Sequence, residues 1–153
     1  MDVQIARDDL SDGAVAKLLS DHLDQMFELS PASDVHALRP QELVDPRISF
    51  WSARCEHRVL GCCALKSLSN SVGELKAMKV RGDCLRRGIA QRLLTTILED
   101  ARKGGFTKLY LETGNSSAFD PAIMLYRKHG FRECGPFGSY ERTSFSRFFL
   151  LEL

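Results

Sequence analysis

The sequence lacks any long apolar run. No stretch approaches the roughly 18 consecutive apolar residues that a membrane-spanning helix needs. The N-terminal residues also lack the pattern of a secretory signal, since Asp8, Asp9 and Asp12 follow closely. We therefore expect a cytoplasmic protein that does not use a membrane as its partner.

An excess of charge of either sign is also missing. The chain has 21 Lys and Arg residues and 20 Asp and Glu residues, for a formal net charge of +1. Proteins that bind nucleic acids normally carry a strongly basic face. We therefore expect no nucleic acid partner.

The cysteines form no recognisable framework. There are five of them, an odd number, and no two stand in a C-x-x-C pair. We expect reduced, mostly buried thiols and no metal site. The five are Cys55, Cys62, Cys63, Cys84 and Cys134.

Two familiar nucleotide-binding motifs are absent as well. The sequence contains neither G-x-x-x-x-G-K-[ST] for a nucleoside triphosphate nor G-x-G-x-x-G for a dinucleotide. It also shows no internal repeat or low-complexity segment. The length of 153 residues and the ordinary composition predict a single soluble domain over residues 1–153.

The most informative stretch runs from Glu74 to Gly104. Its first part alternates as a strand does, which would place Glu74 and Met78 on the same side if the strand is regular. Apolar residues then recur at the spacing of one helical face until Gly104 and Gly105 end the helix. These helical positions are Ile89, Leu93, Leu94, Ile97, Leu98 and Ala101.

A basic turn containing Gly88 joins this strand to this helix. Backbone N–H groups at a helix start lack intrahelical partners, and the helix dipole adds positive charge there. Gly88 would let a ligand approach the main chain, and Arg81, Arg86 and Arg87 add local charge. The pattern therefore predicts a site for a small phosphorylated ligand. The alternative is a purely structural turn, because many strand–turn–helix units bind nothing.

The other segments follow an alternating order of strands and helices. This order, with a hairpin near the front, predicts an α/β (α+β) domain with a mixed sheet and helices on both faces. We expect strands at Val3–Arg7, Ile48–Arg54, Val59–Leu65, Lys108–Thr113 and Arg147–Leu153, helices near 15–27 and 120–129, and a loop over 30–46. Asp120 is expected to cap the last helix, with Pro121 at its first position.

Two motifs in this chain resemble the GNAT superfamily of N-acetyltransferases. In that family a strand ending in Met-x-Val is followed, eight residues after the Val, by the glycine of an [RQ]-x-x-G-x-[GA] turn. Here Met78 and Val80 end the strand, and Gly88 and Ala90 occupy the small positions. The segment from Leu125 to Phe131 similarly matches L-Y-x-x-x-G-F.

The resemblance implies the GNAT fold, with a central mixed, mostly antiparallel sheet. Its central strand pair would be bulged and splayed to admit the acyl-pantetheine arm of acetyl-CoA as co-substrate. The implied cofactor-binding residues are Met78, Lys79, Val80, Arg86, Arg87, Gly88, Ile89, Ala90, Gln91 and Asn115. The chain departs from the family at Leu85, where Arg or Gln is usual, and at Phe119, where many relatives have Asn.

The chemistry implied by the resemblance is acetyl transfer to an amine by direct attack in a ternary complex. Tyr126 matches the family tyrosine that donates a proton to the departing CoA thiolate. A packed core aromatic is the alternative for this residue. Glu74 is the candidate base for the incoming ammonium, with an exposed strand-end carboxylate as the alternative, and Glu112 is the reserve candidate.

The acceptor end of the cleft is less sharply indicated. His36 and Lys76 are candidate substrate contacts, and in this fold Arg39 and Tyr140 would border the same end. His36 could instead support its own loop. We expect a small-molecule amine as substrate. The alternatives are a protein lysine or N-terminus, and a non-catalytic acyl-CoA-binding module. Relatives are often dimers, so a homodimer is compatible with the resemblance.

Overall fold

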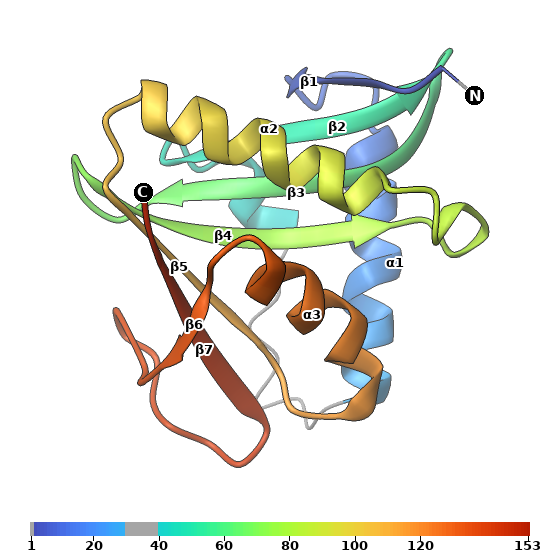
Figure 1. Cartoon of the computed structure of the whole chain (residues 1–153). Helices are drawn as coiled ribbons and strands as arrows, with labels where there is room; N and C mark the ends of the chain where they lie inside the picture. Colours follow the sequence, from blue (N-terminus) through green and yellow to red (C-terminus); the bar gives the residue numbers. More distant parts are fainter. Residues whose placement is uncertain (1, 30–39) are drawn as a thin grey trace.

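The computed structural model describes residues 2–29 and 40–153, which form a seven-stranded mixed sheet covered by helices (Figure 1). The strand order is β1-β2-β3-β4-β5-β7-β6, and every neighbouring pair is antiparallel except β4–β5. The strands are β1 Gln4–Asp8, β2 Ile48–Cys55, β3 Arg58–Ser67, β4 Val72–Val80, β5 Lys108–Gly114, β6 Arg132–Cys134 and β7 Ser146–Glu152. The α-helices are α1 Ala14–Leu29, α2 Ile89–Lys103 and α3 Asp120–Lys128, and short 3-10 helices are η2 Pro40–Val44, η3 Gly82–Cys84 and η4 Ser117–Phe119.

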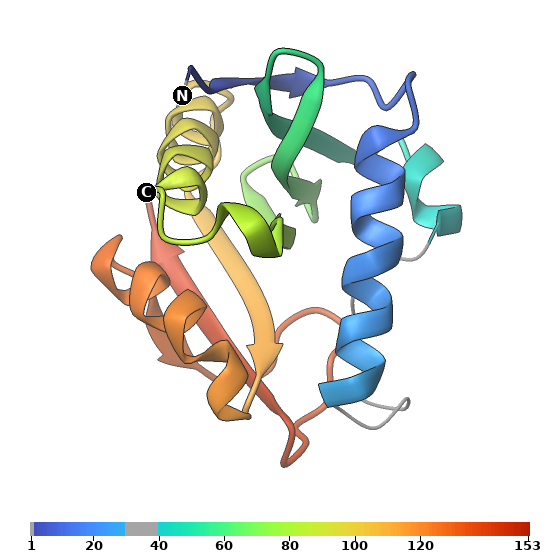
Figure 2. The ribbon, with the colours of Figure 1, turned by 90° about the vertical axis from the view of Figure 1, so that its right-hand side faces the viewer.

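Helices cover both faces of the sheet, as the element order predicted. In Figure 2, α1 lies on one side of the sheet and α2 and α3 lie on the other. Side chains of β2 and β3 alternate between the two apolar cores that result: Phe50 and Cys62 pack with Val15 of α1, whereas Trp51 and Cys63 pack on the α2 side.

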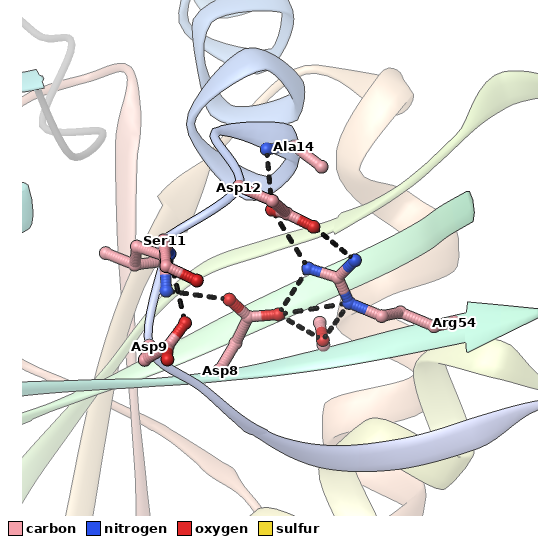
Figure 3. A network of polar contacts seen from close by, with 8 residues as sticks. Asp8, Asp9, Ser11, Asp12, Ala14 and Arg54 are labelled. Atoms are coloured by element: carbon pink, nitrogen blue, oxygen red, sulfur yellow. Dashed lines mark hydrogen bonds and ion pairs between the residues drawn. The ribbon is translucent and has the colours of Figure 1, made fainter. Parts of the chain in front are cut away.

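A polar network fixes the start of α1 to the sheet (Figure 3). The Arg54 guanidinium on β2 donates to Asp8 at 2.8 Å and to Asp12 at 2.7 Å, and Ser52 donates to Asp8 at 2.6 Å. Asp12 also accepts the backbone N–H of Ala14 at 3.0 Å, so its carboxylate joins the helix N-terminus to Arg54. The network therefore sets where α1 leaves the edge of the sheet.

The centre of the sheet carries the bulge and the splay that the resemblance implied. The β3–β4 register shifts between Cys62 and Ala64, and Ala77 adopts a left-handed backbone with φ of 56°. The parallel β4–β5 pairing extends only from Val72 to Leu75. Beyond Leu75 the two strands diverge, as Figure 1 shows.

The bulge overturns one expectation drawn from regular alternation. Glu74 and Met78 do not share a side: Leu75 and Met78 pack on the α2 side, whereas Ala77 packs on the α1 side. The extra residue at the bulge shifts the alternation by one position, so every side chain after it changes face. Glu74, whose neighbour Leu75 faces α2, therefore lies on the α1 face.

One further local expectation was wrong, and one strand had not been expected. Asp120 is the first residue of α3 and does not cap it, because η4 precedes the helix and Phe119 occupies the cap position without a side-chain hydrogen bond. The final strand was expected, but its partner β6 was not. The last strand β7 lies between β5 and β6 and is therefore an interior strand.

Candidate functional site

The turn between β4 and α2, which was predicted to bind a phosphorylated ligand, leaves the start of α2 accessible. Gly88 precedes α2 with φ of 77°, and a side chain added there would meet no atom within 4 Å. Arg81 and Arg58 both donate to Asp83, so these two cations are engaged within the turn region. Arg86 and Arg87 are exposed beside Gly88. The helix start is therefore open, positively charged and accessible along its main chain.

The splayed half of β4 carries the next three predicted contacts. Met78 and Val80 pack against the core on the α2 side. Lys79 faces α1, where it lines a hollow of about 620 Å³ together with residues of α1, β3 and the turn. Burial lowers the pKa of Lys79 below its ordinary value. The β4 edge that faces β5 has no strand partner beyond Leu75, within the described part of the chain.

Tyr126 of α3 lies on the α2 side of the opening. Its side chain is buried and packs edge-on against Phe131, with ring centroids 5.7 Å apart. Its hydroxyl makes no hydrogen bond to another described residue. Burial, with a smaller effect of Cys63 at the bulge, raises the pKa of Tyr126 well above its ordinary value. The phenol therefore stays protonated at neutral pH and is available as a donor.

Glu74 lies on the opposite face, within a buried polar cluster. The Tyr140 hydroxyl donates to Glu74 Oε2 at 2.6 Å, and Lys76 Nζ lies 3.7 Å from the same oxygen. Lys76 Nζ also donates to the Tyr140 hydroxyl at 3.3 Å. The side chains of Glu74 and Lys76 are only 5% and 10% exposed. The structure thus brings the candidate base and the candidate substrate contact together.

Glu112, the reserve base, belongs to the same face. It alternates along β5 with Leu111, which is buried in the core on the α2 side. Burial comes first among the causes that raise the pKa of Tyr140 far above its usual value, followed by Glu74, Glu112 and Glu42. Both candidate carboxylates are therefore near the Tyr140 ring.

The two segments that follow β5 hold their residues differently from the family pattern. The Asn115 amide donates to the carbonyl of Ser144 at 2.8 Å, so it joins the end of β5 to the loop before β7. The Phe119 ring packs on Gly114, where a Cβ would come within 2.2 Å of it. Phe119 thus fills space beside the strand end with an apolar ring.

Three further predictions concern a loop, a metal site and a membrane span. His36 and Arg39 lie outside the described residues. Within residues 2–29 and 40–153, no group of three or more His, Cys, Asp or Glu side chains is arranged to hold a metal ion. The helices of those same ranges are too short or too polar to span a membrane.

Tyr140 was named only as a border residue of the acceptor end, and its contact with Glu74 was missed. The two residues are 66 positions apart, and Tyr140 lies in a loop without regular structure. The available signal in the sequence was the recurrence of aromatic residues at Phe137, Tyr140 and Phe148. In the structure these three rings pack together, with centroids 5.0 to 5.8 Å apart. Nothing in the spacing indicated that this group would reach β4.

Solved acetyltransferase structures share the fold of this chain. An acetyltransferase from Streptococcus agalactiae superposes with a TM-score of 0.77 at 18% identity, covering 99% of this chain and 98% of that chain. A GNAT family acetyltransferase from Elizabethkingia anophelis, solved with acetyl-CoA bound, has a TM-score of 0.69 at 20% identity, again covering 99% and 98%. The fold is therefore that of the GNAT acyltransferases.

Sequence comparison gives the family. The chain is 41% identical over 138 residues to the N-acetyltransferase YsnE of Bacillus subtilis, covering 90% of this chain and 91% of that relative. The model of the acetyltransferase (GNAT) family matches residues 15–131. The chain belongs to this family and is an N-acetyltransferase.

Proposed function

We propose that this enzyme transfers an acetyl group from acetyl-CoA to a primary amine of a small molecule, by direct attack within a ternary complex. A single domain over residues 1–153 would carry both substrate sites. One observation carries the proposal: beside the β4–β5 opening, a carboxylate, Glu74, lies on one face of the sheet near the end of the paired part of β4, and an unengaged phenol, Tyr126, lies on the other. An amine could enter from one face while a thiolate leaves toward the other.

The donor site is supported by the backbone geometry of the described residues. Open space beside Gly88 and the amides that begin α2 fit a diphosphate. The unpaired edge of β4 from Met78 to Val80 fits the amide groups of a pantetheine arm. The acetyl-CoA bound in the Elizabethkingia anophelis structure supports the same choice of donor. Around this core the contacts would come from Lys79, Arg86, Arg87, Ile89, Ala90, Gln91 and Asn115.

Glu74 and Tyr126 would divide the proton transfers of the reaction. An ammonium is not a nucleophile, so Glu74 would take its proton, directly or through a water, before attack on the thioester carbonyl. A backbone N–H near the bulge, at Met78 or Lys79, would stabilise the oxyanion. As the tetrahedral adduct collapses, the CoA thiolate would leave and take the Tyr126 hydroxyl proton, and the adduct nitrogen would pass its second proton to the Tyr126 oxygen. The raised pKa of Tyr126 disfavours a lasting phenolate, so the two transfers would be coupled.

The acceptor is inferred from the charge of the cluster on the α1 face. Glu74, Glu112 and Glu42 act on Tyr140, whereas Lys76 is the cation in contact with it. An excess of carboxylates favours a positively charged amine. Because Glu74 is buried, the acceptor group must be slender, which suits a small amine. A protein lysine or N-terminus would need a wider groove, and a non-catalytic module would need neither Glu74 nor Tyr126.

A thiol-release assay tests the proposal. The purified protein is incubated with acetyl-CoA and a panel of small amines, diamines, amino acids and lysine-containing peptides, and free CoA is measured with a thiol reagent. We expect release with at least one small amine and none with peptides. Release with peptides alone would support the protein-acetylating alternative. Binding of acetyl-CoA without release for any acceptor would support the non-catalytic module.

A further inference from the structure

We propose that Tyr140 is a positioning residue for the reaction: its hydroxyl bridges Lys76 to Glu74 and holds one carboxylate oxygen, so that the other oxygen faces the acceptor. This inference rests on the proposed function, because it takes Glu74 to be the base. Neither Tyr140 nor this division of the two oxygens follows from the family motifs in the sequence.

The contacts within the cluster are unequally divided between the two Glu74 oxygens. Tyr140 donates to Oε2 at 2.6 Å, and Lys76 Nζ lies 3.7 Å from that same atom. Among the described residues, Oε1 accepts no hydrogen bond. A carboxylate has about four lone-pair sites, so Oε1 keeps its full capacity to accept a proton.

Apolar contacts of its ring hold Tyr140 in place, and its hydroxyl makes the polar contacts. Its ring packs against Phe137 and Phe148, with centroids 5.0 and 5.7 Å away. Lys76 Nζ donates to the hydroxyl at 3.3 Å, which orients the O–H bond toward Glu74. The hydroxyl thus accepts from one charged group and donates to the other.

The charges that face this cluster come from four elements. Lys76 lies on β4, Glu112 on β5 and Glu42 on η2, and Lys66 is the β3 cross-strand neighbour of Glu74. Among the described residues, Tyr140 makes the only hydrogen bond to this carboxylate. Removal of the hydroxyl would therefore free the carboxylate to turn away from the acceptor.

The matched test compares Tyr140→Phe with Tyr110→Phe. Tyr110 stacks on Phe137 at 4.7 Å and is the β5 neighbour of Glu74, but among the described residues its hydroxyl makes no hydrogen bond to Glu74. The pH dependence of kcat/KM is measured for both variants with the best acceptor. We expect the acidic limb of Tyr140→Phe to move from its wild-type position, and that of Tyr110→Phe to stay in place.

Two further variants separate failure of this inference from failure of the proposed function. Glu74→Gln should abolish the acidic limb. If it does so while Tyr140→Phe leaves the limb unmoved, the positioning role is refuted and the base assignment stands. If Glu74→Gln keeps the wild-type limb, the base assignment and the positioning role are both refuted. Should Tyr140→Phe fail to fold, Phe137→Leu gives a second test, since loss of a ring that packs on Tyr140 must also move the limb.

Discussion

At the scale of single residues, Tyr126 has an apolar environment and a hydroxyl that makes no hydrogen bond to any other described residue. Replacement by Phe removes that hydroxyl and keeps the ring contact with Phe131. We expect Tyr126→Phe to lower turnover at saturating acetyl-CoA at least about tenfold, the lower range of general acid catalysis. Steady-state kinetics measure this effect.

The control for this variant is its stability. Because the lost hydroxyl has no partner among the described residues, the midpoint of thermal unfolding should change little. Unchanged turnover in a folded Tyr126→Phe protein would assign Tyr126 to packing alone.

Residue identity and spacing in short local motifs were enough to select Tyr126 and Gly88 as candidates, whose roles stay predictions. They were not enough to predict the face on which Glu74 lies. Regular alternation placed Glu74 with Met78, and the bulge at Ala77 separated them. Ala77 has a left-handed backbone although alanine rarely adopts one, so its own identity gave no sign of the bulge.

At the scale of elements, the start of α2 depends on the backbone of Gly88. An alanine there must adopt φ near 77°, which costs about 1–2 kcal/mol, and its methyl would enter the space proposed for the diphosphate. We expect Gly88→Ala to weaken acetyl-CoA binding about tenfold or more. Titration calorimetry measures the affinity.

Gly82 supplies the matched control in the same turn. It also has no atom within 4 Å of an added Cβ, but its φ is not positive. Gly82→Ala should therefore bind acetyl-CoA as the wild type does. Equal affinities for wild type and Gly88→Ala would argue against this helix start as the phosphate site.

The position of α1 depends on Arg54. Burial alone would raise the pKa of Asp8, but hydrogen bonds from Ser52 and Arg54 outweigh it and lower that pKa. Arg54, with the Ala14 N–H, lowers the pKa of Asp12 to about 2. Since Asp8 is only 5% exposed, Arg54→Gln should cost about 1–3 kcal/mol of unfolding free energy at pH 7.

The lowered pKa values of Asp8 and Asp12 make this stability depend on pH. Carboxyls with a lowered pKa in the folded state stabilise it above the unfolded pKa of about 4, and this contribution is lost as the pH falls toward 2. In urea unfolding, the difference between wild type and Arg54→Gln should therefore shrink below pH 4. Arg47→Gln, which breaks only an exposed pair with Asp45, should show little difference at any pH.

Most elements could be predicted because their signals are local. The β2–β3 hairpin, α2 and β5 lie within a few residues of their expected ranges, since periodicity and glycine stops define each of them. The short strand β6 and the interior place of β7 were not foreseen. The three residues of β6 are too few to show an alternation of polar and apolar side chains, and strand order depends on contacts between residues far apart in sequence.

At the scale of the whole molecule, ligand binding should raise the free energy of unfolding. Acetyl-CoA at about 100 times its Kd should add about 2.7 kcal/mol to the unfolding free energy. For a chain of this size that corresponds to a rise in Tm of roughly 5–10 °C. Thermal unfolding followed by circular dichroism measures it, and Gly88→Ala should show a smaller rise at the same concentration. An unchanged Tm for the wild type would count against acetyl-CoA as the donor.

The candidate site as a whole could be predicted only in part. The proposed donor half lies, apart from Asn115, in one continuous stretch from Met78 to Gln91, which short motifs select. The proposed acceptor half joins β4 to a loop residue 66 positions later, through the Tyr140–Glu74 hydrogen bond. Such a contact depends on the complete fold, and no local pattern in the sequence specifies it.

The short parallel pairing of β4 with β5 has a kinetic consequence. Past Leu75, the facing edges expose main-chain groups that an extended, amide-bearing molecule can satisfy as a substitute strand. A bound acetyl-CoA would then connect β4 to β5 and restrict the motion of the residues that contact the amine. We expect an ordered sequence of addition, in which acetyl-CoA binds first and the acceptor follows.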